Sequence, residues 1–167
     1  LRPKQNNGEG RRFSPLIEST FRKHSCMNPW QGGGSAFLKK AEEIAKDVLA
    51  AEAPRIDRDA TWPEKGLRTL LSEGFGGLVV PRQYGGKGQG LLMLARVCEI
   101  LSKECPSTGI CFGMHCVATS VMSVNATDAQ RENFLNPICE GKHITSLSLS
   151  ELGTGIHFYL PQTSLTA

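Results

Sequence analysis

A stretch near the end of the chain, residues 146–156, has residue types that could hold a ligand. It reads SLSLSELGTGI. Alternating serine and leucine is typical of a strand with one polar and one apolar face. The edge of such a strand offers backbone N–H groups and the Ser150 hydroxyl to polar groups of a ligand. Gly153 and Gly155 lack a Cβ, so the backbone can approach bulky ligand groups closely. On spacing alone, an ordinary hairpin is the commoner structure for this pattern.

The cysteines and His115 do not predict a metal site or a catalytic site. No two cysteines have the C-x-x-C spacing that places two thiolates on one ion. We predict buried, reduced thiols, which favours a reducing compartment. His115 has no Asp, Glu or second His within about one helical turn to orient it, so we predict a core histidine with satisfied nitrogens. The cysteines are Cys26, Cys98, Cys105, Cys111, Cys116 and Cys139.

The charge distribution disfavours a nucleic-acid partner. The formal net charge is +3, but residues 1–25 hold six Lys or Arg and two Glu, which leaves the rest of the chain at −1. A nearly neutral globular part lacks the basic surface that binds phosphates. No uninterrupted apolar run approaches the ~20 residues that span a bilayer, so we also expect no membrane span.

Hydrophobic periodicity predicts five helices that would position these residues. We expect Pro54 to end the first helix and Gly74 to end the second, and Thr127 with Gln130 has capping-box spacing at the start of the fifth. The fourth helix is apolar nearly all round, so we expect it to be the buried centre of a bundle. The predicted helices cover residues 35–53, 63–73, 91–103, 106–124 and 127–139.

Residues 74–88, between the second and third helices, are too rich in glycine for a helix. Their composition resembles a nucleotide-binding loop, but the spacing does not. A G-x-G-x-x-G motif that uses Gly86 and Gly88 needs glycine at position 91, where Leu91 stands. A P-loop needs Ser or Thr after Gly86-Lys87, where Gly88 stands. We therefore predict a shaped loop that is not a nucleotide site.

After Gly141 the apolar spacing changes from about 3.6 to about 2. Ile144, Leu147 and Leu149 are separated by small polar residues, which predicts a strand. The expected fold class is mainly α, a helical bundle followed by the first strand or strands of an incomplete β domain. We expect a flexible basic arm or linker over residues 1–34, a helical domain over 35–141 and the start of a β domain over 142–167.

Three motifs, in this order, resemble the acyl-CoA dehydrogenase family of flavoenzymes. Residues 74–86 are similar to a family loop that ends in Pro-x-x-Tyr-Gly-Gly. Residues 127–141 resemble its helix signature, Gly-Thr-x-x-Gln followed by Leu-Pro and a glycine. Residues 149–155 resemble Leu-Thr/Ser-Glu-Pro-x-x-Gly, with Leu152 where the family has proline. The resemblance runs from about Phe37 to the end of the chain.

The resemblance implies the N-terminal helical bundle and the start of the middle β-barrel domain of an FAD-dependent acyl-CoA dehydrogenase, as in fatty acid β-oxidation. Such enzymes remove hydrogen from the two carbons next to a thioester carbonyl and pass hydride to FAD. The family's base lies in a later domain, so no catalytic residue is assigned and Glu151 is expected to be structural. By resemblance, the flavin-binding positions are Leu147, Leu149, Ser150 and Gly155. The substrate-binding positions are Ile156, Gly109, Phe112 and Gly113.

The resemblance also implies an acyl-CoA thioester substrate, an electron-transfer flavoprotein-type acceptor, and a homotetramer or homodimer at full length. It is compatible with a bacterial cytoplasm or, alternatively, a mitochondrial matrix. A fragment of this length is expected to be inactive alone and to bind flavin poorly. Two alternatives stay open: a flavin monooxygenase or oxidase of the same fold with a non-CoA substrate, and a non-catalytic helical binding module.

Overall fold

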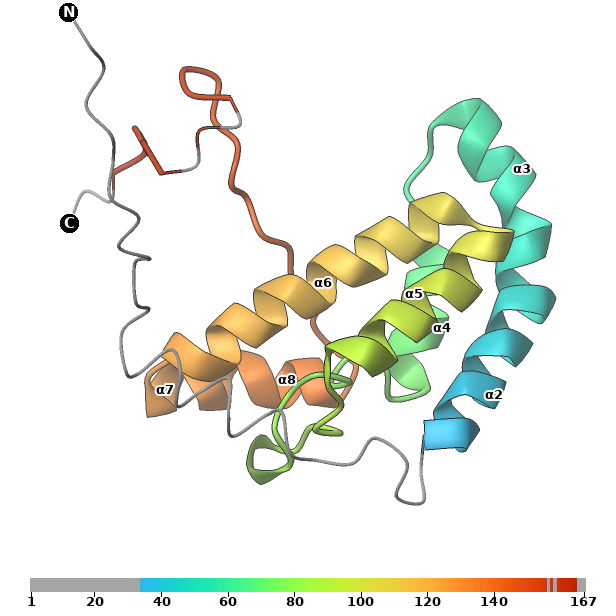
Figure 1. The fold of residues 1–167 in the computed structure, drawn as a ribbon, viewed down its shortest axis with the longest axis horizontal. Helices are drawn as coiled ribbons and strands as arrows, with labels where there is room; N and C mark the ends of the chain where they lie inside the picture. Colours follow the sequence, from blue (N-terminus) through green and yellow to red (C-terminus); the bar gives the residue numbers. More distant parts are fainter. Residues whose placement is uncertain (1–33, 156, 158, 165–167) are drawn as a thin grey trace, which may run out of the picture.

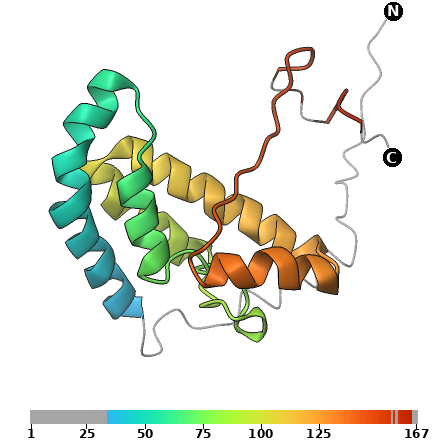
Figure 2. The same ribbon diagram turned by 180° about the vertical axis from the view of Figure 1, so that it is seen from behind.

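The computed structural model describes residues 34–155, 157 and 159–164, and helices make up most of that part (Figure 1). α5 and α6 lie side by side, α2 continues into α3 along one side, and α7 and α8 lie near the C-terminal end of α6 (Figures 1 and 2). The elements are α2 Gly34–Ile44, η1 Ala45–Leu49, α3 Ala50–Asp59, α4 Glu64–Ser72, η2 Arg82–Tyr84, α5 Leu91–Glu104, α6 Pro106–Asn125, α7 Asp128–Gln130, η3 Arg131–Leu135 and α8 Asn136–Cys139.

The core forms where the helices meet the loop that follows α4. The Phe75 ring from this loop is fully buried and meets the Phe37 ring of α2 edge to face, with ring centroids 5.5 Å apart. Its other neighbour is the Phe112 ring of α6, at 6.3 Å. Edge-to-face aromatic pairs are favourable beyond the area they bury. Val97 and Leu101 of α5 complete the same cluster, so the apolar stripes predicted from spacing form one core.

The first predicted helix does not end before Pro54. α2 continues through the π-helical turn η1 into α3, which contains Pro54. In η1 the Ala50 N–H bonds to the Ala45 carbonyl five residues back, so the hydrogen-bond ladder is shifted before the proline removes a donor. Leu49 and Ile56 on either side are buried. Burying two such side chains contributes about 3–6 kcal/mol, against about 3 kcal/mol for an interior proline, so packing overrides the local signal.

The fifth predicted helix begins as expected at Thr127. The Thr127 Oγ1 accepts the Gln130 N–H at 3.3 Å, and the Gln130 Oε1 accepts the Thr127 N–H at 2.9 Å. This is the predicted capping box. The helix runs through α7, η3 and α8 and is followed by Gly141, whose φ is 76°. A Cβ on Gly141 would lie 2.5 Å from the Leu71 carbonyl oxygen, so α8 and α4 meet closely at this turn.

α6 is buried on one face only, which corrects the expectation of a wholly buried central helix. On its outward face Ile110 is 68% exposed and Val124 is 64% exposed. Among the described residues, α6 is also the one helix long and apolar enough to cross a bilayer by length and composition. Core helices of soluble proteins pass the same test, so this finding does not by itself indicate a membrane span.

Residues 142–155, here called the exit segment, lead away from the helices (Figures 1 and 2). Their last five residues, 151–155, form a turn. In the described residues, β pairing is limited to one bridge between Glu151 and Gly155. A strand needs a neighbouring strand for its N–H and C=O groups, and the described part supplies none. The mainly α fold class is confirmed. The expected arm over residues 1–34 lies almost wholly outside the described residues, and the three segment boundaries stay predictions.

Candidate functional site

The exit segment presents backbone groups that are open to a ligand. Residues 146–150 make no hydrogen bond to any other described residue. Leu147 is half-buried, Leu149 is 50% exposed, and Ser150 is exposed. Open N–H and C=O groups and a short hydroxyl are what the polar edge of a flavin ring needs, so these residues fit that group. The segment points away from the helices, which therefore do not supply the other side of such a site (Figure 2).

The turn after these residues is held together by Glu151. The Glu151 carboxylate accepts the Gln162 N–H at 2.6 Å and the Thr163 N–H at 3.2 Å. The bond from Gln162, with that from Thr163, lowers the pKa of Glu151. Gly155 donates its N–H to the Glu151 carbonyl at 2.8 Å and has a φ of 54°, a conformation that favours glycine. Glu151 is therefore a structural residue, as expected. The predicted substrate position Ile156 lies outside the described residues.

His115 joins the exit segment to the rest of the molecule. The side chain is 1% exposed, its Nε2 lies 3.0 Å from the Gly76 carbonyl oxygen, and its Nδ1 accepts the Thr145 N–H at 3.2 Å. Burial lowers the pKa of His115, while the bond to the Gly76 carbonyl acts in the opposite direction. Both ring nitrogens are thus satisfied, as predicted for a core histidine.

The three predicted tunnel residues of α6 have different surroundings. Phe112 is 1% exposed in the core, and Gly109 packs against α5, where a Cβ would collide with the Ser102 side chain. Gly113 is partly exposed, and a Cβ there would meet only the Cys98 Sγ, at 3.6 Å. Of the three, only Gly113 lies toward the outward face of α6. Their role in an acyl tunnel stays a prediction.

α6 carries small polar residues inward and branched apolar residues outward. The Thr119 and Ser123 hydroxyls donate to carbonyls four residues back, at 2.6 and 2.8 Å, so their burial leaves no hydroxyl unpaired. The buried polar residues are Thr108, His115, Thr119 and Ser123. The outward face, as the term is used below, consists of the exposed residues Ile110, Val117, Val121 and Val124.

Sequence reasoning missed this face because a helix that is apolar nearly all round shows no dominant apolar side. A signal was nevertheless present in the polar residues. His115, Thr119 and Ser123 recur every four residues and therefore share one face of the helix. The structure turns that face to the core and the opposite face to the surface.

The glycine-rich loop, residues 74–90, is built for packing. A Cβ on Gly76 would lie 2.5 Å from the Ile138 carbonyl oxygen, so only glycine lets the loop meet α8 at this distance. The Arg131 guanidinium of η3 lies over the Tyr84 ring, 4.9 Å from its centroid, in a cation–π contact. These contacts give the loop a structural role.

The prediction of buried thiols holds for two of the described cysteines: Cys105 and Cys116 are buried, whereas Cys98, Cys111 and Cys139 are partly exposed. Burial raises the pKa of the Cys98, Cys116 and Cys139 thiols, which keeps them neutral. Every cysteine within the described ranges is free, and no three His, Cys, Asp or Glu side chains gather there in a metal-binding arrangement. Cys26 lies outside those ranges.

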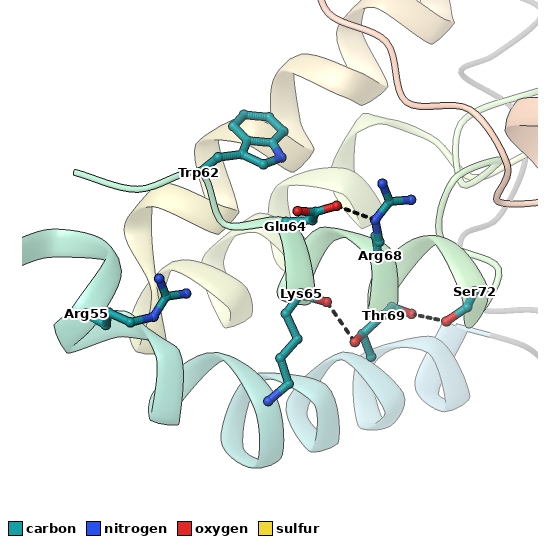
Figure 3. A pocket seen from close by; sticks show the side chains of 7 residues that line it. All are labelled: Arg55, Trp62, Glu64, Lys65, Arg68, Thr69 and Ser72. Carbon is teal, nitrogen blue, oxygen red and sulfur yellow. Dashed lines mark hydrogen bonds and ion pairs between the residues drawn. The ribbon is translucent and has the colours of Figure 1, made fainter. Parts of the chain in front are cut away.

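An open hollow between α3 and α4 is lined by charged side chains (Figure 3). Its cations already have partners: the Arg68 Nε lies 2.8 Å from Glu64, and Arg55 and Lys65 both lie beside Glu52, at 2.9 and 3.8 Å. Exposed ion pairs of this kind contribute little to stability. None of the residues predicted to bind flavin or substrate lines this hollow.

The chain is similar in sequence to acyl-CoA dehydrogenases. It is 32% identical over 124 residues to mitochondrial isovaleryl-CoA dehydrogenase of Arabidopsis thaliana. The aligned region covers 71% of this chain and 30% of that protein. The chain thus spans about a third of the length of this relative.

Two solved structures share the fold. The butyryl-CoA dehydrogenase of Megasphaera elsdenii matches with a TM-score of 0.69 and 26% identity, over 77% of this chain and 34% of that one. A structure from work on the electron transferring flavoprotein of Acidaminococcus fermentans matches with a TM-score of 0.72 and 28% identity, over 83% of this chain and 37% of that one. The family described as acyl-CoA dehydrogenase, N-terminal domain, matches residues 34–142, and the chain belongs to this family.

Proposed function

We propose that this chain is the N-terminal helical part of a flavin-dependent acyl-CoA dehydrogenase, an oxidoreductase that introduces a double bond next to the thioester carbonyl of an acyl-CoA. The single observation that carries the proposal is the outward face of α6. A helix that buries several polar side chains and exposes a row of branched apolar ones is suited to line an apolar site made with further chain. Family membership supports the same assignment.

The exit segment would hold the flavin. Backbone groups of Leu147 and Leu149 and the hydroxyl of Ser150 would bond to the polar edge of the ring, and the turn at Gly155 would lie near the pyrophosphate. Bound FAD would supply the hydride acceptor. The residues of this chain would bind and orient it, and the leucines would help to exclude water from its face. Ile156 is proposed to lie near the substrate.

The acyl chain would run along α6. Gly113 is suited to contact it directly because it lies toward the open side of the helix, with Val117 one turn further on. Phe112 and Gly109 would act from the other side, by holding α6 against the core and α5. No residue of this chain is proposed as the catalytic base, and alone the chain is expected to be inactive and to bind flavin poorly.

Partners and location follow from the proposed activity. The substrate is an acyl-CoA thioester, and an electron-transfer flavoprotein-type acceptor would reoxidise the flavin. We propose a homotetramer or homodimer for the full-length protein. The proposed location is the cytoplasm or, alternatively, the mitochondrial matrix; the name of the Arabidopsis relative says that it is mitochondrial.

The test uses the full-length product of the coding sequence that contains this chain. We expect a yellow protein whose flavin absorbance is bleached by an acyl-CoA in the absence of oxygen. The 167-residue chain should show no turnover under the same conditions. Oxygen consumption with a non-CoA substrate would assign the same-fold oxidase or monooxygenase instead. A colourless full-length protein would support a helical binding module and overturn the proposal.

A further inference from the structure

His115 forms hydrogen bonds that allow only one tautomer. A backbone N–H can only donate, so the Nδ1 that lies 3.2 Å from the Thr145 nitrogen must be unprotonated. The proton of the neutral ring is then on Nε2, which donates to the Gly76 carbonyl oxygen at 3.0 Å. The side chain is 1% exposed, so water does not substitute for either partner. A ring protonated on both nitrogens would lose the bond from Thr145.

The two bonds connect parts of the chain that are far apart in sequence. Gly76 lies 39 residues before His115, and Thr145 lies 30 residues after it. The ring therefore links the glycine-rich loop, α6 and the exit segment at one point. An aliphatic side chain could fill the same space, but it would leave the Thr145 N–H and the Gly76 carbonyl without this partner.

Thr145 is the last anchored residue before the open part of the exit segment. The Lys142 and His143 N–H groups bond to the Pro137 carbonyl, and residues 146–150 make no hydrogen bond to another described residue. In extended chain Leu149 lies about 13 Å beyond Thr145. The direction in which the segment leaves the helices is thus set at the bond to His115.

We propose that His115 is a positioning residue, whose neutral Nε2–H tautomer clamps Thr145 and so sets where the backbone of residues 147–150 is presented. That these residues receive a flavin rests on the proposed function. The clamp itself rests only on the two bonds and the burial of the ring.

Three substitutions of His115 distinguish the effect of its bond to Thr145 from the effect of its bond to Gly76. In His115→Asn, the amide oxygen lies near the place of Nδ1 and can accept the Thr145 N–H, but the side chain is too short to reach Gly76. In His115→Gln, the amide nitrogen can reach the Gly76 carbonyl, but no acceptor lies beside Thr145. His115→Leu removes both bonds at similar volume. Ser123→Ala is the matched control, because Ser123 lies on the same buried side of α6 and its hydroxyl donates to the Thr119 carbonyl of its own helix.

The measurement is hydrogen exchange of the Thr145 amide by NMR in the 167-residue chain. We expect slow exchange in the wild type, in His115→Asn and in Ser123→Ala, and roughly fivefold faster exchange in His115→Gln and His115→Leu, the factor that one net hydrogen bond gives. Nitrogen shifts of the His115 ring, measured in the wild type, should show an unprotonated Nδ1 and a protonated Nε2. A protonated Nδ1, or equal Thr145 exchange in the wild type and His115→Gln, overturns the clamp.

The flavin affinity of the full-length protein tests whether the clamp positions residues 147–150 for a flavin. We expect weaker binding in His115→Gln and His115→Leu and near-normal binding in His115→Asn. Equal affinity in all variants, with altered Thr145 exchange, would overturn the positioning role. If the wild-type full-length protein binds no flavin, the proposed function and the identity of the positioned ligand are both refuted. The exchange rates of the Thr145 amide would still show whether His115 clamps Thr145.

Discussion

Glu151 lies inside the motif of residues 149–155, where a carboxylate could be taken for a catalytic group. Its oxygens, however, accept hydrogen bonds from two backbone N–H groups. His115 shows the same behaviour, with both nitrogens taken by backbone groups. Thr119 and Ser123 bond to carbonyls of their own helix. At the scale of single residues, these polar side chains bond to backbone groups and thereby fix the backbone.

Thr127→Ala should destabilise the chain by about 1 kcal/mol, because it removes the capping-box acceptor of the Gln130 N–H. Urea denaturation measures the difference in free energy of unfolding. Thr69→Ala is the control, since Thr69 lies in the interior of α4 and its hydroxyl donates to the carbonyl of Lys65 in the same helix. It should be neutral or stabilising by a few tenths of a kcal/mol through helix propensity. Equal losses in the two variants would argue against a functional cap.

Stability should decrease as the pH falls below about 6.5, the ordinary pKa of histidine. Burial lowers the pKa of His115 in the folded chain, so the unfolded chain takes up this proton first and gains from acidification. The stabilisation that comes from the neutral His115 ring is complete above pH 6.5. As the pH falls from 6.5 to the pKa of His115 in the folded chain, this stabilisation decreases by no more than about 1.4 kcal/mol per pH unit. Urea midpoints across this range measure it. The decrease should be smaller in His115→Leu and should persist when the exposed His143 is replaced by Leu.

Among the helices, the contact between α5 and α6 depends on one glycine. Gly109 faces the Ser102 side chain so closely that a Cβ would also lie 3.3 Å from the Ser102 Cα. Backbone atoms of a helix cannot move aside as a flexible side chain can. A Cβ at position 109 would therefore force α5 and α6 apart. Gly113, one turn further on, has only the Cys98 Sγ nearby, at 3.6 Å.

Gly109→Ala and Gly113→Ala should therefore have opposite effects. Overpacking costs about 1–3 kcal/mol and helix propensity returns up to about 1 kcal/mol, so Gly109→Ala should lower the free energy of unfolding by about 1 kcal/mol. Gly113→Ala, without the clash, should raise it by up to about 1 kcal/mol. Chemical denaturation of both variants tests this. A stabilising Gly109→Ala would contradict the close crossing.

The sequence predicts elements better than it predicts their surroundings. Periodicity placed the helices, and the spacing of Thr127 and Gln130 identified a real cap. The end expected at Pro54 was wrong because buried neighbours in space, which local spacing does not reveal, outweigh the proline. The expected strand has no partner strand in the described residues, because the spacing of apolar residues predicts an extended backbone but not its pairing. The flavin positions stay predictions, and nothing in the sequence indicated the bond from the Thr145 N–H to His115 that ties this stretch to α6.

For the molecule as a whole, the main feature is the outward face of α6. Four branched apolar residues on one helix face water in the described structure. Exposed apolar surface that is contiguous usually marks a place of contact with other chain. The hollow of Figure 3 is a poorer candidate for such a role because its charges are already paired.

The isolated chain should bind the dye ANS through the outward face. Replacing Val117 and Val121 together by Lys should reduce ANS fluorescence, while the free energy of unfolding should change by no more than about 0.5 kcal/mol per site, as for other exposed positions. Leu91→Lys, on α5 and also exposed, is the control and should leave the fluorescence unchanged. Equal dye binding in the double variant and the wild type would show that this face does not act as an apolar surface.

The glycine-rich loop has its supports much later in the chain, and this has a consequence during synthesis. Tyr84 accepts a bond from the Cys139 thiol, 55 residues downstream. At usual elongation rates of about 5–20 residues per second, roughly 3–11 s pass on the ribosome between the two residues. During that interval the nascent loop cannot pack against α8, because α8 has not yet been synthesised. The loop should therefore be the part of the nascent chain most accessible to proteases and most dependent on chaperones. A premature stop before residue 136 would make that exposure permanent.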